Sequence, residues 1–347
     1  MDTIKVIKLQ GDWHTMGRQY GNAAVDLMKD VLAYLDSKLA GFPDKMANAA
    51  DIAEKLFAHY PEYLKEFFDG ISETSSIPLE RLKLCNAAEY VEGCFFCSAM
   101  AACGDYTGGK LIYGRNYDAV NYSEIAPDLV MTVFHPDGEQ SAAIVGYAGE
   151  IYCVNGINSS GIFIELNNGM PSAGYDIHWE LCPSTTLLFE QLFKATSIDD
   201  MDRFFRETRS FASFIIGVAD RSEARSYEWC YDGVRIGSTT ANDGLMACTN
   251  HFVNGAWPYP VPDDADSWNS ISRRANMLAR SLESRGDLDV RKIKAIMSSS
   301  IEDGGPWHTH TRYQIVAVPE DLTLHINIPG CPGWTELKPF SKGILKK

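Results

Sequence analysis

The stretch Gly93-Cys94-Phe95-Phe96-Cys97-Ser98-Ala99-Met100 divides the chain into two parts with different sequence patterns. Helical periodicity dominates before it, and strand patterns dominate after it. A cysteine followed by a hydroxyl residue therefore lies at the junction. Because a cysteine thiolate is a strong nucleophile that can hold an acyl group as a thioester, Cys97 is a candidate catalytic residue.

The part before the junction is predicted to be mainly helical. Apolar residues recur at three- and four-residue steps from Ala24 to Leu35, which is typical of an amphipathic helix. Pro61 and Pro78 stand near the starts of later helical patterns, where proline is tolerated. These patterns cover roughly 50–60, 62–74 and 79–91, and a short strand-like segment, Val6–Gly11, precedes them all. We therefore treat 1–96 as a helical N-terminal segment, either a pro-segment or a smaller chain.

The part after the junction alternates between strands and pairs of helices. Turn residues separate the predicted strands, which cover 111–116, 129–134, 141–146, 161–168, 213–219, 225–229, 245–249, 313–318 and 322–328. Helices are predicted over 184–194, 198–207, 270–282 and 289–298. This order predicts an α+β fold in which helices pack outside a sandwich of antiparallel sheets, with 97–347 as one domain.

Charge and length narrow the class of partner. The chain has 347 residues, of which 45% are hydrophobic, and its formal net charge is −15. Nucleic acids and anionic membrane surfaces attract basic proteins, so this charge favours a small-molecule or peptide-like substrate. The first residues do not resemble a signal peptide, and no apolar run is long enough to span a bilayer. A soluble, cytoplasmic protein is the expectation, and a homo-oligomer stays possible.

The cysteines favour free thiols over disulfides. There are nine, scattered along the chain and mostly inside apolar runs. The pair Cys94 and Cys97 has the spacing of redox or zinc motifs, but no second pair accompanies it. His308 and His310 could form two ligands on one strand face, yet no carboxylate or third histidine is placed to complete a site. We therefore expect no metal, and place the two histidines in a loop near a pocket.

Cys97 needs a base, because the unperturbed pKa of a thiol is about 8.5. None of the eight histidines is near Cys97 in sequence, although His251, His308 and His310 could reach it through the fold. The α-amino group that Cys97 would gain if the Phe96–Cys97 bond were cut is another base. Its reference pKa of about 7.7 to 8.0 suits neutral pH.

Six short motifs follow one another along the chain: Leu9-Gln10-Gly11 with Gly17-Arg18-Gln19-Tyr20-Gly21, Cys97-Ser98, Gly114-Arg115-Asn116-Tyr117-Asp118, Gly156-Ile157-Asn158-Ser159-Ser160-Gly161 through Asn167, Cys248-Thr249-Asn250-His251, and Asp266-Ser267-Trp268. In this order they resemble the acyl-coenzyme A:6-aminopenicillanic acid acyltransferase-like family of N-terminal-nucleophile hydrolases, and more distantly the choloylglycine hydrolases. The resemblance covers nearly the whole chain.

The resemblance implies an αββα fold and a precursor that cuts itself between Phe96 and Cys97. Cys97 would then attack a linear, non-peptide amide, with its own amine as base. By position, Asn250 would donate to the oxyanion, Asp118 would orient the cysteine or its amine, and Arg312 would be the arginine near the site. The residues expected to bind substrate are Arg115, Asn116, Asn167 and His251. For His251, a structural hydrogen bond is favoured over the role of catalytic base.

Several alternatives stay open. Phe96 stands where the family often has glycine, and Gly93-Cys94 lies just upstream, so Cys94 is a rival nucleophile. Hydrolysis is favoured over acyl transfer, because water is always available and no coenzyme A site or other cofactor is indicated. The chain could also be a thiol redox protein using Cys94 and Cys97, or a non-catalytic binding protein. Taken singly, Asp118 and Asn250 are typical turn residues, and Arg115 and Arg312 typical surface charges.

Overall fold

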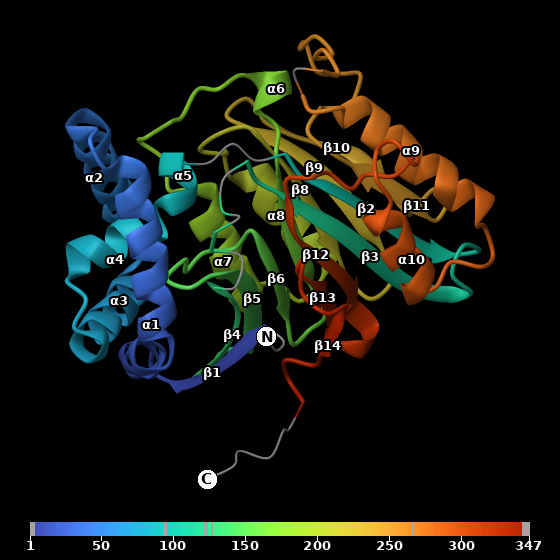
Figure 1. The fold of residues 1–347 in the computed structure, drawn as a ribbon. Coiled ribbons are helices and arrows are strands. Elements are labelled where there is room, and N and C mark those ends of the chain that lie inside the picture. The colour runs from blue at the N-terminus through green and yellow to red at the C-terminus, as the bar shows by residue number, and fades with distance from the viewer. Residues whose placement is uncertain are drawn as a thin grey trace.

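The computed structural model describes residues 4–92, 96–120, 122, 124–125, 128–265 and 267–341, and its centre is a pair of sheets packed face to face (Figure 1). The larger sheet has eight strands, antiparallel except that the first runs parallel to its neighbour. In spatial order they are β1 (Lys5–Gly11), β4 (Leu129–Pro136), β5 (Ala142–Tyr147), β6 (Asn155–Asn158), β7 (Phe163–Asn168), β8 (Phe214–Ala219), β9 (Ala224–Cys230) and β10 (Gly233–Thr239).

The smaller sheet has six antiparallel strands, and the junction residue Cys97 lies next to one of them. In spatial order they are β11 (Leu245–Cys248), β2 (Ser98–Gly104), β3 (Gly109–Asp118), β12 (Thr311–Val318), β13 (Thr323–Asn327) and β14 (Thr335–Leu337). Cys97 immediately precedes β2, and Ser98 pairs with Asn116 of β3.

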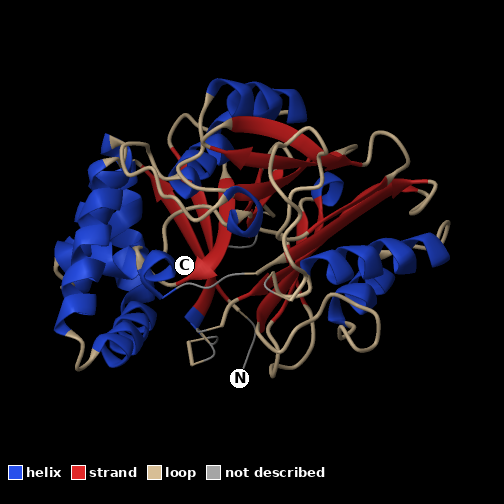
Figure 2. Ribbon diagram, turned by 90° about the horizontal axis from the view of Figure 1, so that it is seen from above, coloured by secondary structure: helices blue, strands red, loops and turns tan. Residues whose placement is uncertain are grey.

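Helices cover the outer face of each sheet (Figure 2). The larger sheet contacts α7 (Ser184–Lys194) and α8 (Ile198–Glu207), whereas the smaller sheet contacts α9 (Ser270–Glu283) and α10 (Val290–Ser298). The predicted α+β fold, with two sheets sandwiched between helices, is confirmed. The helices predicted over 184–194 and 198–207 have those bounds in the structure.

The N-terminal helices form a group at one end of the sandwich, drawn in blue to teal in Figure 1. They are α1 (Trp13–Leu39), α2 (Pro43–Ala58), α3 (Glu62–Ser75), α4 (Leu79–Asn86) and α5 (Ala88–Glu92). The single helix predicted over 79–91 is two helices, because the chain leaves helical geometry at Ala87 (φ −96°, ψ 2°). Strand β1 does not stay with the helices but joins the larger sheet beside β4, which anchors the N-terminal segment to the core.

Strands β2, β6, β10 and β14 lie outside the predicted strand ranges, because their sequences carry weak strand signals. β6 reads Asn-Gly-Ile-Asn, β14 has three residues, and β10 is a half-exposed edge strand with two glycines. The remaining short elements are α6 (Met170–Ala173) and a 3₁₀ turn, Pro319–Asp321. In the described part of the chain, no helix combines the length and apolarity needed to cross a membrane. The eight described cysteines are all free thiols.

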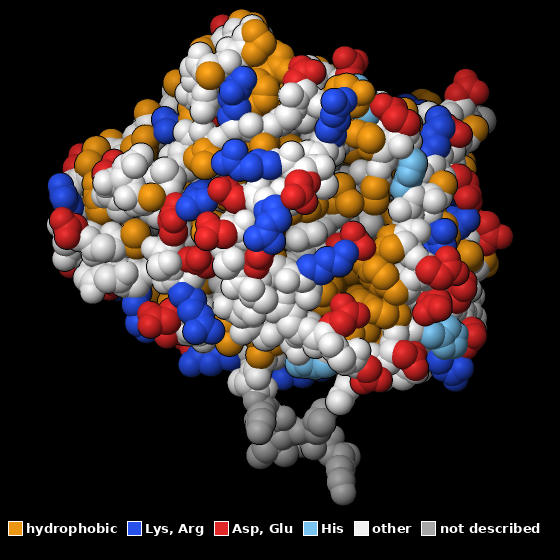
Figure 3. Space-filling model, turned by 180° about the vertical axis from the view of Figure 1, so that it is seen from behind, with side chains coloured by type: hydrophobic (Ala, Val, Ile, Leu, Met, Phe, Trp, Pro, Cys, Tyr) orange, Lys and Arg blue, Asp and Glu red, His pale blue; other side chains and the backbone are white. Residues whose placement is uncertain are grey.

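Surface charge of both signs is mixed over the back of the molecule, where lysine and arginine side chains alternate with aspartate and glutamate (Figure 3). Many surface charges of the protein pair locally, as Arg81 does with Asp36 and Lys83 with Glu54. Exposed pairs of this kind contribute little to stability, about 0 to 1 kcal/mol each. The apolar contact between the sheets therefore matters more for the fold than these surface pairs.

The glycines of the N-terminal motif allow α1 and α3 to pack backbone against backbone. A Cβ at Gly17 would overlap the carbonyl oxygen of Phe67, and a Cβ at Gly70 would overlap that of His14. Backbone atoms inside two packed helices cannot move aside easily. The motif Gly17-Arg18-Gln19-Tyr20-Gly21 therefore has a packing role in this chain.

We predict that Gly17→Ala lowers the free energy of unfolding by about 1–3 kcal/mol, because the added methyl overpacks the contact between α1 and α3. Denaturant unfolding followed by circular dichroism measures the change. Gly255→Ala is the matched control, since a Cβ there meets no atom within 4 Å. Equal stabilities for the two variants would contradict the packing role.

Candidate active site

Cys97 is buried at the start of β2, with 1% of its surface exposed. Burial raises the pKa of its thiol above the ordinary value, and the nearby Asp118 carboxylate adds to this. Arg115 and Arg273 act in the opposite direction. Nη2 of Arg115 lies 3.4 Å from the Cys97 Sγ, which is hydrogen-bonding distance for sulfur. The thiol therefore rests in its neutral form with a cation positioned to favour its ionisation.

Arg115 reaches from the smaller sheet to the larger one. Its Nη1 forms an ion pair with Glu165 of β7 and donates to Oδ1 of Asn167 at 3.3 Å. Glu165 and Asn167 both face β3 because alternate residues of a strand share a face. Asn167 in turn donates to Glu165 at 3.1 Å and to Cys248 Sγ at 3.4 Å. Arg115, Asn167 and Cys97 are thus brought together, as the sequence predicted for one site.

A second buried arginine, Arg273 of α9, organises the other side of Cys97. Its Nη1 donates to Oδ2 of Asp118 at 2.7 Å and to the carbonyl oxygen of Phe96 at 3.3 Å. Its Nη2 donates to Oδ1 of Asn250 at 2.8 Å. Burial raises the pKa of Asp118 to about 6, although Arg273 and a hydrogen bond from Thr311 lower it. Asp118 and Asn250 are therefore held by one guanidinium.

The Asn250 side chain has a defined orientation. Because its Oδ1 accepts from Arg273, its amide nitrogen Nδ2 is free to donate, and it does so to the carbonyl oxygen of Asn168 at 2.8 Å. One of the two Nδ2 hydrogens is used in that bond, so the other can serve a ligand. His251, the next residue, is held by Ser270, whose Oγ lies 2.7 Å from its Nδ1. Burial lowers the pKa of His251 to about 4, so this ring is neutral near pH 7.

Two expected site residues make other contacts. Asn116 neighbours Arg115 on β3 and so points to the opposite face, where its Nδ2 donates to the Met297 carbonyl of α10 at 2.9 Å. Arg312 donates to the carbonyl oxygen of Val120 at 2.8 Å and lies beside His310. The arginines that contact Cys97 and Asp118 are Arg115 and Arg273. Cys94, the rival nucleophile, lies outside the described residues, as does Asp266 of the last motif.

An aromatic stack covers the residue before Cys97. The Phe96 ring stacks on Trp268, with centroids 4.3 Å apart and planes 25° apart. Trp268 also contacts the rings of His308 and His310, at 5.2 and 5.0 Å. Trp268 has a φ of 54°, which a bulky side chain rarely adopts. The two histidines thus lie near the site, where burial lowers the pKa of both, His308 to about 4.

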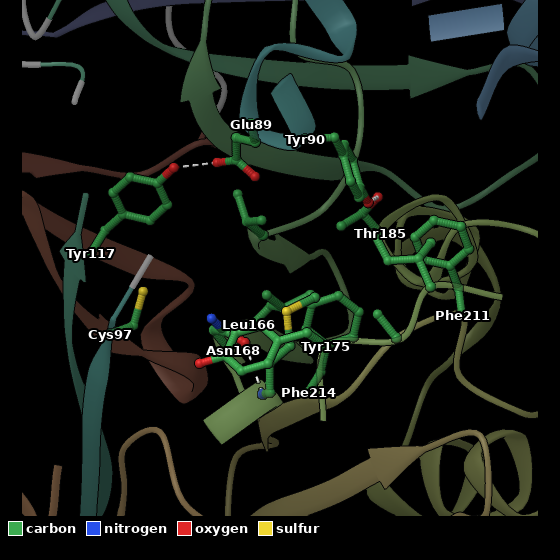
Figure 4. A pocket seen from close by; sticks show the side chains of 14 residues that line it. Glu89, Tyr90, Cys97, Tyr117, Leu166, Asn168, Tyr175, Thr185, Phe211 and Phe214 are labelled. Carbon is green, nitrogen blue, oxygen red and sulfur yellow. Dashed lines mark hydrogen bonds between the residues drawn. The ribbon is translucent and has the colours of Figure 1, made fainter. Parts of the chain in front are cut away.

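A cavity of about 280 Å³ opens beside Cys97 (Figure 4). Apolar side chains form most of its wall, and Glu89 and Tyr90 of α5 close one side. Tyr117 lies between Cys97 and Glu89 and donates a hydrogen bond to the Glu89 carboxylate (Figure 4). Among the described residues, no cluster of three or more histidine, cysteine or carboxylate side chains is placed to hold a metal ion.

Sequence reasoning missed three charged residues of this region, namely Glu89, Glu165 and Arg273. Glu165 lies within an apolar strand, and Arg273 shares the buried stripe of α9 with Met277 and Ser281. Both Glu165 and Arg273 are charged residues on the apolar face of a strand or helix, and this feature of the sequence could have identified them. Glu89 carried no such signal, because α5 is a short helix of five residues.

Comparison with known proteins agrees with the motifs. Residues 106–276 match the model of the acyl-coenzyme A:6-aminopenicillanic acid acyl-transferase family. The match covers just under half of the chain. The resemblance inferred from the motifs is thereby confirmed, and the matched acyltransferase segment contains Asp118, Asn250 and Arg273. Cys97 lies before its first residue. No curated protein matches the chain.

The chain is also similar to three solved structures at low identity. One is a Caenorhabditis elegans N-acylethanolamine-hydrolyzing acid amidase ortholog, with 17% identity, coverage of 64% of this chain and 93% of that one, and a TM-score of 0.49. Another is a mutant of a conjugated bile acid hydrolase from Clostridium perfringens, with 12% identity, coverage of 69% of this chain and 92% of that one, and a TM-score of 0.48. The third is penicillin V acylase from Agrobacterium tumefaciens, with 11% identity, coverage of 70% of this chain and 86% of that one, and a TM-score of 0.44. At these values the likeness carries no information about the reaction of this chain.

We predict that Asp118→Asn lowers the free energy of unfolding by about 3–5 kcal/mol, because it leaves the buried guanidinium of Arg273 without its counter-charge. Thr311→Val is the matched comparison. It removes only the hydroxyl that donates to Asp118 at 2.6 Å, so a loss of about 1 kcal/mol is expected. Chemical denaturation of both variants tests this order, and a smaller loss for Asp118→Asn would contradict it.

Proposed function

We propose that the protein is a self-processing cysteine amidohydrolase or acyltransferase of the N-terminal-nucleophile class, acting on a linear, non-peptide amide through a thioester on Cys97. The observation that carries this proposal is the position of the Cys97 thiol. It lies between the guanidinium of Arg115 and a cavity large enough for an acyl group, beside the Asp118–Arg273–Asn250 network. The family match of the following residues supports the same class of reaction.

In the first step the chain cuts itself. The Cys97 sulfur attacks the Phe96 carbonyl carbon, and the negative charge that develops on the carbonyl oxygen is stabilised by Arg273, whose Nη1 is 3.3 Å from that oxygen. The C–N bond to Cys97 then breaks, and the thiol proton passes to the departing nitrogen. Water hydrolyses the resulting thioester, which frees the thiol and leaves Phe96 with a carboxylate. Cys97 thereby gains an α-amino group.

In the second reaction this amine is the base for attack on substrate. It takes the thiol proton and returns it to the leaving amine, while the acyl group stays on Sγ until water or another acceptor removes it. The spare Nδ2 hydrogen of Asn250 is the proposed oxyanion donor, and such a donor commonly contributes about 3 kcal/mol. Asp118 positions Arg273 and opposes premature ionisation of the thiol, whereas Arg115, held by Asn167, favours the thiolate at the moment of attack.

The segments before and after the proposed cut share a sheet and a cavity. Strand β1 pairs with β4 along seven residue pairs, and α5 contributes Glu89 and Tyr90 to the cavity. The smaller chain, 1–96, would thus stay bound after cleavage and complete the site of the larger chain, 97–347. Hydrolysis is favoured over transfer to another acceptor because water is always present at high concentration.

We predict that purified wild-type protein gives two masses under denaturing conditions, 1–96 and 97–347, whereas Cys97→Ala gives one intact chain. Intact-mass spectrometry makes the measurement. Cleavage should also become faster as the pH rises from 6 to 8, because burial raises the pKa of the thiol and little thiolate is present at the lower pH. Cys331→Ala, which replaces an exposed thiol, is the control and should be cut normally. A single full-length mass for the wild type would sink the self-cleavage step.

The stack on Phe96 is proposed to hold the scissile bond in position for this attack. We predict that Trp268→Ala slows cleavage by roughly ten- to a hundredfold, since small displacements of reacting atoms have effects of this size. A time course of fragment formation measures the rate, and an unfolding curve verifies that the variant folds. Trp334→Ala removes a tryptophan that contacts Lys294 of α10 instead, and it should be cut at the wild-type rate. Equal rates for both variants would exclude a positioning role for Trp268.

A further inference from the structure

The cavity beside Cys97 is mainly apolar, and besides the residues of α5 its polar lining residues include Asn168 and Thr185. Its apolar wall residues are Val154, Leu166, Met170, Ile177, Phe211 and Phe214. Tyr175, which is 67% exposed, stands at the rim. Glu89 is the one carboxylate among the described lining residues, and it faces the cavity across from Leu166 (Figure 4). An acid in such surroundings requires an explanation, because an apolar cavity disfavours a charged group.

The contacts of Glu89 leave part of its carboxylate available. Oε1 accepts the hydroxyl of Tyr117. The Tyr152 hydroxyl is near the carboxylate but has no hydrogen-bond partner among the described residues, so Oε2 can accept from a further donor. Burial raises the pKa of Glu89, although Tyr117, Arg115 and the Tyr152 hydroxyl favour its ionised form. The second acid nearby, Glu150, is also buried, and the two carboxylates oppose each other's ionisation. Among the described residues, Tyr117 is therefore the one hydrogen-bond donor to the Glu89 carboxylate, and no cationic side chain forms an ion pair with it.

A ligand can supply a further donor. A protonated amine placed against Oε2 would form a charge-assisted hydrogen bond, which is roughly twice as strong as a neutral one. A purely apolar ligand would fill the same space but leave Oε2 without a partner and further from water. The net charge of −15 also favours cationic over anionic ligands.

The acyl part of the substrate is the part that fits this description. Cys97 itself lines the cavity, and the acyl group stays attached to Sγ from the first attack until deacylation, whereas the amine leaves early. The wall next to Cys97 is thus in contact with the acyl group for the longer part of the cycle. Its apolar side chains match an aromatic or aliphatic body, and Glu89 matches a polar end.

We propose that the cavity selects an acyl group with an apolar body and a protonated amine at its far end, which binds Glu89. This inference rests on the proposed amidase function and names its substrate class. Glu89 is the specificity-determining residue, with Tyr117 holding its carboxylate. Because Glu89 precedes the proposed cut, the smaller chain sets the specificity and the larger chain carries out the chemistry.

The test uses two anilides that differ only at one end, the 4-nitroanilides of 4-(aminomethyl)phenylacetic acid and 4-ethylphenylacetic acid. The wild type should hydrolyse the aminomethyl compound with a kcat/KM about ten- to a hundredfold higher, the range expected for one hydrogen bond to a charged group. Glu89→Gln keeps the acceptor for Tyr117 but removes the charge, so it should lose this preference. Glu66→Gln, at an exposed position of α3, makes the same charge change elsewhere and should keep it.

A binding measurement separates this proposal from the proposed reaction. The Cys97→Ala variant cannot react, yet its intact chain has the cavity, and calorimetry with the two free amides, 4-(aminomethyl)phenylacetamide and 4-ethylphenylacetamide, measures the preference directly. Tighter binding of the aminomethyl amide, abolished by adding Glu89→Gln, supports the inference even if no anilide is hydrolysed. Equal binding, preferred binding of the ethyl amide, absence of binding by both, or a preference that survives Glu89→Gln would overturn it.

Discussion

The ion pair between Arg115 and Glu165 is the constraint on which the rest of the site depends, because it fixes the two sheets face to face at the nucleophile. Both side chains are fully buried, and further hydrogen bonds offset part of the cost of burying the pair. Glu165 has further donors in Tyr113, at 2.9 Å, and Asn167. Opposite it on β8 is Gly217, where a side chain would overlap both the Glu165 carboxylate and the Tyr113 hydroxyl. The intersheet space is therefore shaped around one guanidinium, and that guanidinium contacts the thiol.

Arg273 has the corresponding role on the helical side. It joins α9 to β3 through Asp118, to the loop after β11 through Asn250, and to the chain before β2 through the Phe96 carbonyl. Two arginines from different layers thus hold Cys97 from two directions. Their positive charge offsets part of the burial effect on the thiol pKa without leaving the thiol ionised at rest. This arrangement suits a nucleophile that must first react with its own backbone and later with a substrate.

The N-terminal segment is part of the core and of the site as well. Strand β1 extends the larger sheet, glycines bring α1 and α3 into backbone contact, and α5 forms one wall of the cavity. Most helices and strands could be predicted from the periodicity of apolar residues, including α7 and α8 with their observed bounds. The candidate site was predicted for Cys97, Arg115, Asp118, Asn167 and Asn250, since motif order identified them. Asn116 points to the opposite face of β3 from Arg115, because neighbouring strand residues alternate. Arg312 contacts Val120 and His310.

The sequence by itself determined the α+β class, the change of pattern at Cys97 and the resemblance of the motif order to the acyltransferase family, because these depend on local periodicity and on residues adjacent in the chain. Only the tertiary structure decided which charges meet. Arg273 is 155 residues from Asp118 and Glu165 is 50 from Arg115, so neither pairing leaves a trace in local sequence. The same holds for Glu89, whose position opposite Tyr117 depends on how α5 packs against the sandwich. Local patterns specify which face of an element is buried, whereas the partner it is buried against depends on the packing of elements distant in the chain.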